Sequence, residues 1–215
     1  MIDNIELIIH NSIKIKYQNI IIYFDPFRLE QKDKLLERAN YIFITHSHFD
    51  HYSENDIKLI KDDNTKIIIP SDLEDKVLEF GFKKDNILVV KPNNKYKIDD
   101  IDFETVRAYN EHKEFHKKEY DWVGYIITLN NERIYVAGDT DNTIDARNVK
   151  CDIALIPIGG IYTCDYKEAI ELVKVIKPKI VVPTHYNSIV GSREDGYRFK
   201  EELDNIVKVE LLLKK

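Results

Sequence analysis

The sequence contains little cysteine and no long apolar run, and both absences narrow the classes of protein that it can encode. Its 215 residues include two cysteines, Cys151 and Cys164, which form no CxxC motif. With no secretory leader recognised at the N-terminus, we expect no disulfide and predict a reducing, cytoplasmic compartment. No apolar run approaches the roughly 18 residues that a membrane-spanning helix needs, so no membrane segment is predicted.

Positive charge is not in excess either. The 32 Lys and Arg residues are outnumbered by 38 Asp and Glu residues, and the formal net charge is −6. This balance argues against a general nucleic-acid-binding surface, although it leaves room for a local basic groove. The apolar fraction of 43% and the charged fraction of 33% are ordinary for a soluble globular protein. The sequence has no Gly-x-Ser-x-Gly elbow, so nothing suggests a serine triad.

Histidine, in contrast, is concentrated in one place. The run Thr45-His46-Ser47-His48-Phe49-Asp50-His51 directly follows the apolar stretch 41–44 and holds three imidazoles and a carboxylate. Imidazole suits zinc, iron and related ions, and a carboxylate supplies the negative charge that a second divalent ion needs. The alternative is a solvated polar turn that happens to be rich in histidine. The concentration of ligand types at a strand end argues against it, and the run predicts a metal site.

The spacing within this run indicates how two ions could share it. His46 and His48 lie two positions apart, so in an extended chain both side chains would face the same way. Asp50 and His51 need a tighter turn, or the start of a helix, to reach a second ion. Ser53 and Asp56 form a pair that resembles a capping box and predict such a helix start.

Strand and helix patterns alternate along the chain without a linker, a low-complexity tract or a repeat. Strands are predicted at 5–9, 12–16, 19–25, 41–45, 66–70, 87–90, 95–97, 101–108, 122–129, 133–137, 152–157, 179–183 and 207–213, and helices at 31–38, 54–61, 72–80, 165–176 and 194–204. Asn130-Asn131 predicts a hairpin turn. This order is typical of sheets covered by helices, and we expect a single domain over residues 1–215.

Two later strand ends also carry residues of the ligand type. Gly138-Asp139-Thr140-Asp141 follows the strand 133–137, where glycine permits a sharp turn and the two oxygens of Asp139 could bridge two cations. Taken alone, this motif would be read as a turn with a helix cap. His185 follows the apolar strand 179–183 in the same way, and we interpret it as a ligand rather than a structural histidine.

The third ligand of the first ion is less well defined by the sequence. The predicted strand 101–108 is followed by Tyr109-Asn110-Glu111-His112-Lys113-Glu114-Phe115-His116. Asn110 occupies the strand end where a ligand would be expected, and both His112 and His116 are available. We prefer His116, with His112 as the alternative, and with Asn110 or a water in that position if neither binds. His10, in an early turn, is predicted to be structural or exposed.

The assembled residues, His46-x-His48-x-Asp50-His51, one loop histidine, Asp139 and His185, resemble the metallo-β-lactamase superfamily in order and approximate spacing. The resemblance covers nearly the whole chain and implies an α/β (α+β) fold, a four-layer αββα sandwich with its metal site at the edge between the two sheets. Four further motifs are similar to the small metal-dependent hydrolases of that superfamily, which include the ascorbate-6-phosphate lactonase-like proteins. These motifs are Asp25-Pro26, Gly138-Asp139-Thr140, Pro157-Ile158-Gly159-Gly160 and Pro183-Thr184-His185-Tyr186-Asn187.

Carried over to this sequence, the resemblance implies a centre of two divalent metal ions, with zinc expected first and Mn²⁺ or Fe²⁺ as alternatives. The implied ligands are His46, His48 and His116 for the first ion, Asp50, His51 and His185 for the second, and Asp139 as a bridge. The sequence departs from the superfamily pattern at Asn110.

We therefore predict a metal-dependent hydrolase that uses a metal-bound hydroxide on a small ester, lactone or phosphodiester. Asp50 is the candidate to relay a proton towards the leaving group, and Tyr186 would either donate its hydroxyl or merely pack. The expected partner is a small-molecule substrate. Dimerisation could help to wall an exposed cleft, but no stripe in the sequence demands a second copy.

Three other functions compete with this prediction. A metal-dependent nuclease is disfavoured by the negative net charge and by the lack of an inserted domain or long basic arm. A catalytically inert metal-binding scaffold of the same fold would be free to lose Asp139 or His185, and both are present. Di-iron redox chemistry usually replaces one histidine of the turn by glutamate, whereas position 48 is histidine.

Overall fold

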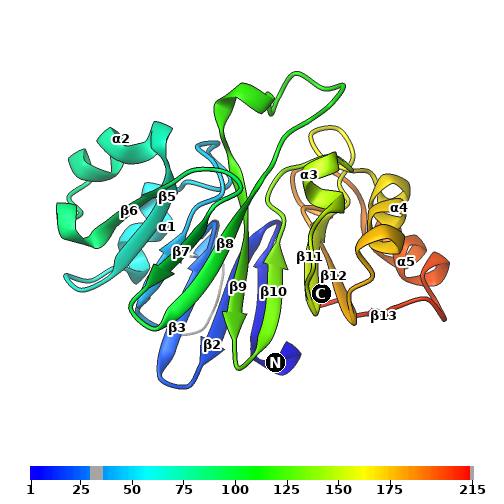
Figure 1. Cartoon of the computed structure of the whole chain (residues 1–215), viewed down its shortest axis with the longest axis horizontal. Helices are drawn as coiled ribbons and strands as arrows, with labels where there is room; N and C mark the ends of the chain where they lie inside the picture. Colours follow the sequence, from blue (N-terminus) through cyan, green and yellow to red (C-terminus); the bar gives the residue numbers. More distant parts are fainter. Residues whose placement is uncertain (30–35, 214–215) are drawn as a thin grey trace. The chain divides into compact units, whose positions relative to one another are not determined.

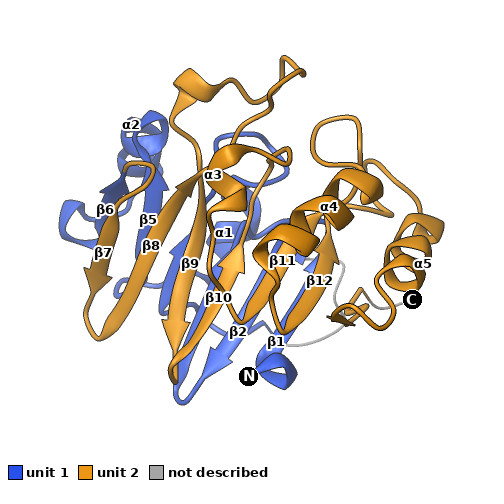
Figure 2. Ribbon diagram, turned by 45° about the vertical axis from the view of Figure 1, so that its right-hand side comes forward, with its two compact units in different colours: residues 1–90 blue, residues 91–215 orange. Residues whose placement is uncertain are grey.

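The computed structural model describes residues 1–29 and 36–213 (Figure 1), and its chain divides into two compact units. Unit 1 comprises residues 1–90 and unit 2 comprises residues 91–215 (Figure 2). Each unit is built around one β-sheet. Most of the helix predicted over 31–38 lies outside the described residues. The single domain expected over residues 1–215 stays a prediction.

Unit 1 contains a six-stranded sheet in which the strands follow one another in chain order. The first three strands pair antiparallel, and the strands from β3 to β6 pair in parallel. The strands are β1 (Ile5–Ile9), β2 (Ser12–Tyr17), β3 (Ile20–Phe24), β4 (Tyr41–Phe43), β5 (Lys66–Pro70) and β6 (Ile87–Val90). The helices are α1 (Glu54–Ile60) and α2 (Glu74–Glu79), with short 3-10 turns at Ile2–Asn4, Ser71–Leu73 and Lys84–Asn86.

The helix start predicted after the histidine run is present. Ser53 accepts a hydrogen bond from the backbone N–H of Asp56 and so caps α1. Ile57 and Ile60 of this helix are fully buried and belong to the same apolar cluster as Ile42 of β4. Burial of this apolar face holds α1 in place, and α1 in turn anchors the end of the histidine run.

Unit 2 contains a seven-stranded sheet with the order β13-β12-β11-β10-β9-β8-β7. Pairing is antiparallel from β7 to β10 and parallel from β10 to β13. The strands are β7 (Lys95–Ile98), β8 (Ile101–Arg107), β9 (Val123–Leu129), β10 (Glu132–Val136), β11 (Ile153–Pro157), β12 (Ile180–Thr184) and β13 (Lys208–Val209). The helices are α3 (Ile144–Arg147), α4 (Tyr166–Ile176) and α5 (Arg193–Glu202), with a 3-10 turn at Lys118–Tyr120.

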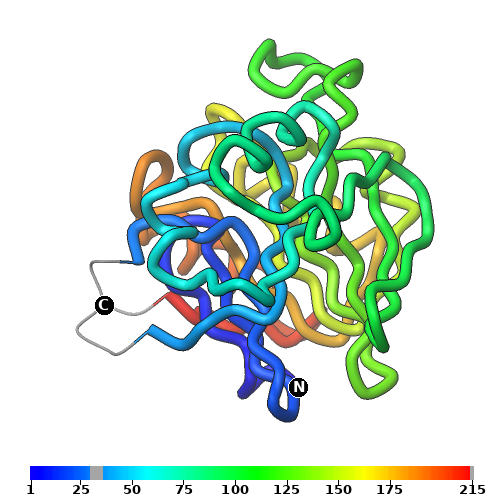
Figure 3. The backbone as a smooth tube through the Cα atoms, turned by 90° about the vertical axis from the view of Figure 1, so that its left-hand side faces the viewer, coloured from blue at the N-terminus to red at the C-terminus, as the bar shows by residue number. Residues whose placement is uncertain are grey.

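Figure 2 shows α3 and α4 over one face of this sheet, and α4 buries Ile170, Leu172 and Val173 in the core of unit 2. The hairpin between β9 and β10 turns at Asn130 and Asn131, both with positive φ, as the sequence predicts. The segment between β8 and β9 projects beyond the end of the sheet (Figures 1 and 3). This segment carries Asn110 and His116.

Two differences from the predicted elements have simple causes. The last strand was expected over 207–213 but is limited to β13, which pairs only with residues 180 and 181 of β12 at the edge of the sheet. The short helix α3 was not predicted, because four residues are too few to show a helical repeat. Thr143 caps it by accepting a hydrogen bond from the N–H of Ala146. Among the described residues, no helix has the length and apolarity needed to cross a bilayer.

Candidate metal centre

The histidine run forms a tight turn at the end of β4 in unit 1. The backbone N–H groups of His51 and Tyr52 both donate to the carbonyl of His48, at 3.0 and 2.8 Å. Nε2 of His46 lies 3.1 Å from Nδ1 of His48, and the ring centroids of His46 and His51 are 3.9 Å apart. The turn therefore brings the predicted histidines together, as their spacing indicated.

A buried carboxylate beneath this turn sets the orientation of His51. Asp25 has no exposed surface, and its Oδ2 lies 2.7 Å from Nδ1 of His51. It also accepts hydrogen bonds from the backbone and the hydroxyl of Thr45 and from the amide of Asn11, at 2.7–2.8 Å. A carboxylate accepts only, so Nδ1 of His51 carries the proton and Nε2 keeps the lone pair in the neutral ring.

The same network reaches His46. The hydroxyl of Thr45 has one hydrogen-bond donor, which it directs to Asp25, and its oxygen lies 3.0 Å from Nδ1 of His46. Nδ1 of His46 is therefore the donor in that contact, and its Nε2 also keeps a lone pair. Sequence reasoning missed this role of Asp25, which it used only as a strand end and a family motif. The available signal was its place before proline at the end of a strand.

Asp50 contacts His10, a residue that the sequence placed outside the site. Nε2 of His10 lies 3.1 Å from Oδ2 of Asp50, and His10 has no exposed surface. The exposed alternative predicted for His10 is therefore wrong. One ligand atom from each of His10, Asp50 and His51 lies within 4.8 Å of the others. His10 is thus placed to hold the carboxylate of Asp50 in position.

In unit 2, three predicted ligands meet at one oxygen atom. Oδ2 of Asp139 lies 3.2 Å from Nε2 of His116 and 3.0 Å from Nε2 of His185, and all three side chains are buried. Gly138, with a φ of +66°, makes the turn that directs Asp139 off the end of β10, as predicted. His185 follows β12 with a φ of +55°, a left-handed conformation that is uncommon for a residue with a side chain.

The tight packing around His185 requires a glycine opposite it. A Cβ added to Gly159 would lie 2.1 Å from the carbonyl oxygen of His185, 3.2 Å from its Nδ1, and 2.7 Å from Cγ2 of Val190. No side chain can be accommodated at these distances without movement of the backbone. Gly159, which the sequence marked only as part of a family motif, therefore supports the position of His185.

The candidates left open for the first ion differ in burial. His116 is buried beside Asp139, whereas His112 is exposed in the same loop. Asn110 contacts His116 through its side chain, with Oδ1 at 3.0 Å from Nδ1. Of the three residues that the sequence could not separate, His116 is the one that the structure brings to Asp139, a candidate ligand of unit 2.

Tyr186 packs in the core of unit 2. Its ring lies against Gly196 of α5, where an added Cβ would come within 2.6 Å of Cε2. The side chain is 3% exposed, and this burial raises the pKa of Tyr186 to about 12, with Tyr197 adding to the rise and Arg193 opposing it. The surroundings of Tyr186 favour the packing role over the catalytic role that the sequence left open.

The donor atoms in both units suit the expected ions. Imidazole nitrogen and carboxylate oxygen are ligands for Zn²⁺, Fe²⁺ and Mn²⁺, and the described residues include histidine and aspartate groups that could hold a metal ion. Cys151 and Cys164 are free, and burial raises the pKa of both thiols, to about 12 for Cys151. Metal-binding thiols are deprotonated, so neither cysteine is suited to be a ligand.

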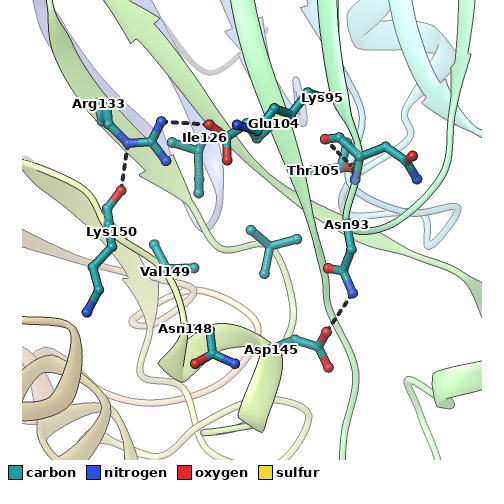
Figure 4. A pocket seen from close by; sticks show the side chains of 12 residues that line it. Asn93, Lys95, Glu104, Thr105, Ile126, Arg133, Asp145, Asn148, Val149 and Lys150 are labelled. Carbon is teal, nitrogen blue, oxygen red and sulfur yellow. Dashed lines mark hydrogen bonds and ion pairs between the residues drawn. The ribbon is translucent and has the colours of Figure 1, made fainter.

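A recess of about 380 Å³ on unit 2 has a different character (Figure 4). Arg133 donates to Glu104 at 2.7 Å and to the carbonyl of Lys150 at 2.8 Å, and Asn93 donates to Asp145 at 2.7 Å (Figure 4). The residues that line it include no histidine. Arg133 and Glu104 already pair with each other, Asp145 accepts from Asn93, and the recess offers no imidazole to a metal ion.

Comparison with known proteins supports the assignment made from these residues. Residues 4–185, which span both units, match the family model of the beta-lactamase superfamily domain. A protein from Pyrococcus abyssi is 32% identical over 197 residues, 90% of this chain and 87% of the relative. A relative from Nanoarchaeum equitans, named a UPF0173 metal-dependent hydrolase, is 29% identical over 204 residues, with 91% and 89% covered.

Solved structures agree on the fold. A protein from Parabacteroides distasonis is 28% identical with a TM-score of 0.84, covering 98% of this chain and 93% of the other. A metallo hydrolase from Ignicoccus hospitalis, 23% identical, has a TM-score of 0.80 over 96% and 93% of the two chains. The predicted fold class is confirmed, whereas the narrower likeness to ascorbate-6-phosphate lactonases is not. The chain belongs to the metallo-β-lactamase superfamily.

Proposed function

We propose that the protein is a hydrolase of small molecules that depends on two divalent metal ions, with zinc expected first and Mn²⁺ or Fe²⁺ as alternatives. The observation that carries the proposal is the convergence of His116 and His185 on one oxygen of Asp139. The histidine turn of unit 1 and the name of the Nanoarchaeum relative support it. The proposed ligands, in the motif order of the superfamily, are His46, His48, Asp50, His51, His116, Asp139 and His185.

The chain prepares its imidazoles to bind a cation. Asp25 keeps a proton on Nδ1 of His51, and the hydroxyl oxygen of Thr45 accepts a hydrogen bond from the N–H at Nδ1 of His46. Both rings can therefore offer Nε2 to a cation. When bound, the cations lower the pKa of a coordinated water and stabilise negative charge on the oxygen of the scissile bond. Asp50, held by His10 at 3.1 Å, is the proposed residue that passes a proton to the leaving group.

The surroundings of the unit 2 ligands favour an uncharged substrate with an apolar part. Phe115 precedes His116 in the chain, is 47% exposed and contacts the ring of Tyr162 edge to face, with 4.6 Å between centroids. Ile161, which precedes Tyr162 in the chain, is 63% exposed. Lys113, three residues before His116, is paired with Asp141 and Glu168 and so is poorly placed to bind a phosphate. We therefore place small esters and lactones ahead of phosphodiesters.

The first experiment is elemental analysis of protein purified without a chelator or affinity-tag metal, followed by assays on ester, lactone and phosphodiester panels. We expect about two ions per chain, as a dinuclear site requires. His48→Ala and Asp139→Ala should abolish hydrolysis and lower metal content while the circular dichroism spectrum is retained. His112→Ala removes an exposed histidine of the same loop and should change neither quantity.

The outcome separates the competing functions. Less than one ion per chain that reconstitution cannot raise would contradict the proposal and favour an inert scaffold. Metal-loaded protein that cleaves RNA or DNA but no small ester or lactone would favour a nuclease. Unchanged activity in Asp139→Ala would remove Asp139 from the proposed centre.

A further inference from the structure

Asn110 lies three residues after the last residue of β8, where the sequence pattern leads one to expect a metal ligand. It is 7% exposed, and its side chain makes four hydrogen bonds within unit 2. Oδ1 lies 3.2 Å from the backbone nitrogen of His116 and 3.0 Å from its Nδ1. Nδ2 donates to Oδ1 of Asp141 at 3.0 Å and to the carbonyl of Tyr162 at 2.9 Å.

The chemistry of these partners fixes the orientation of the amide. Asp141 and the carbonyl of Tyr162 can only accept, so they must face the NH₂ group of Asn110. The oxygen of Asn110 must then face His116, whose backbone N–H also donates to it. Nδ1 of His116 therefore carries a proton, and in the neutral ring the lone pair is on Nε2, which lies 3.2 Å from Asp139.

Asp141, on the NH₂ side of Asn110, holds the amide in this orientation. Asp141 is buried and accepts hydrogen bonds from Nζ of Lys113 at 2.5 Å and from the backbone of Glu111 at 3.1 Å. Partial burial acts to lower the pKa of Lys113, but the hydrogen bond and charge of Asp141, with Glu168, raise it overall. Lys113 therefore stays charged and fixes Asp141, which fixes Asn110.

The same residue closes the loop that carries His116. The backbone N–H of Asn110 donates to the carbonyl of His116 at 2.7 Å, and the side chain of Asn110 accepts from the N–H of His116. Residues 110–116 thus leave the strand and return to its end. The ring of His116 reaches Asp139 although it lies six positions further along the chain.

We propose that Asn110 is a positioning residue that has taken the place of a strand-end metal ligand. It closes the loop 110–116 and brings the displaced ligand His116 back to Asp139. It also fixes the tautomer of His116 through a relay of hydrogen bonds that runs from Asp141 through Asn110 to His116. This inference rests on the proposed function, because it takes His116 as a ligand. An amide suits the position, since it donates to Asp141 and accepts from His116 at the same time.

The test compares metal binding in variants whose fold is verified by circular dichroism and by thermal denaturation of chelator-treated protein. Zinc affinity is measured by chelator competition, and Co²⁺-loaded protein reports ligand geometry through its visible absorption. We expect Asn110→Ala to lower the affinity for one of the two ions by about 10–100-fold, the usual effect of losing a residue that orients a ligand. The variant should also shift the visible spectrum of the Co²⁺-loaded protein. Asn94→Ala, an exposed amide of the same unit, should change neither.

A paired exchange tests the relay itself. Asn110→Asp keeps an acceptor for His116 but sets a second carboxylate opposite Asp141, so it should also weaken zinc binding. Adding Asp141→Asn removes this repulsion, and the double variant should bind zinc more tightly than Asn110→Asp alone. Equal or weaker binding in the double variant would overturn the relay. This comparison also decides the matter if Asn110→Ala does not fold.

His116→Ala separates failure of this inference from failure of the proposed function. If His116→Ala loses one ion while Asn110→Ala binds zinc like the unmodified protein, the positioning role is overturned and the proposed ligand set stands. If His116→Ala keeps both ions, the ligand set itself is wrong.

Discussion

Replacing Asp25 by asparagine would test whether the buried carboxylate beneath the histidine turn holds that turn together. Three donors meet Oδ2 of Asp25, from Asn11, from the hydroxyl of Thr45 and from His51, and the backbone N–H of Thr45 meets Oδ1. Asparagine has one acceptor oxygen where aspartate has two. Whichever way the amide is turned, its NH₂ group faces at least one of these donors.

The less damaging orientation directs the NH₂ group at the backbone N–H of Thr45. It loses one hydrogen bond to a charged acceptor, which contributes about 1.5–3 kcal/mol, and leaves a buried N–H opposite another donor. Because these two effects overlap, we expect the free energy of unfolding to fall by about 2–4 kcal/mol. The proton on Nδ1 of His51 also loses its charged partner, so zinc affinity should fall by about 10–100-fold.

Urea denaturation of chelator-treated protein measures the first effect without any contribution from bound metal. Far-ultraviolet circular dichroism is the appropriate signal, because the single tryptophan, Trp122, lies in unit 2. Asp56→Asn is the matched control: Asp56 is also buried in unit 1, and it binds Leu29 and Ser53. Its Oδ2 faces a hydroxyl, which can reverse to accept from an amide.

We therefore expect Asp56→Asn to have a smaller effect on stability and none on zinc affinity. The reasoning about Asp25 would be refuted by a loss of under about 1 kcal/mol, since a buried donor facing a donor must cost more than this. It would also be refuted if Asp25→Asn and Asp56→Asn had equal effects on zinc affinity.

Three further predictions concern unit 2. Gly159→Ala should lower the free energy of unfolding by about 1–3 kcal/mol and weaken zinc binding, because its Cβ would lie 2.1 Å from the carbonyl of His185; normal zinc affinity would contradict this. Tyr186→Phe should keep most of the hydrolytic activity, since the ring packs in the core, and a large drop in kcat would restore its catalytic role. The backbone N–H of Arg133 first, and Lys179 second, lower the pKa of Asp152. Asp152→Asn should therefore be less stable than the unmodified protein at neutral pH. The gap in free energy of unfolding between the two proteins should shrink as the pH falls below about 4; a gap that does not change with pH would refute this.

A carboxylate whose pKa is lower in the folded state stabilises the fold above its unfolded pKa, because the unfolded chain binds its proton first. The stabilisation is lost as the pH falls through the folded value. Chemical denaturation of both proteins at a series of acidic pH values measures the gap directly.

The candidate ligand residues, and the strand ends that carry them, could be picked out from the sequence because both are local patterns. The histidine run lies within seven positions, directly after an apolar strand, and Asp139 and His185 each follow a strand whose alternation is visible in the sequence. The strands themselves follow from their apolar residues, and the helix start at Ser53 follows from a capping pattern. Spacing alone could not choose among Asn110, His112 and His116, because a loop of seven residues can close in many ways.

The amino-acid sequence by itself determined the fold class and the order of the candidate ligands, since both depend on short-range patterns of apolar, turn-forming and metal-binding residues. Only the tertiary structure decided which side chains hold those ligands. Asp25 reaches His51, and Asn110 reaches Asp141, across 26 and 31 positions in the chain. Such contacts arise when strands pair and loops close, and each depends on the direction of a hydrogen bond that no local pattern encodes. The burial of His10 and the packing of Tyr186 were decided in the same way.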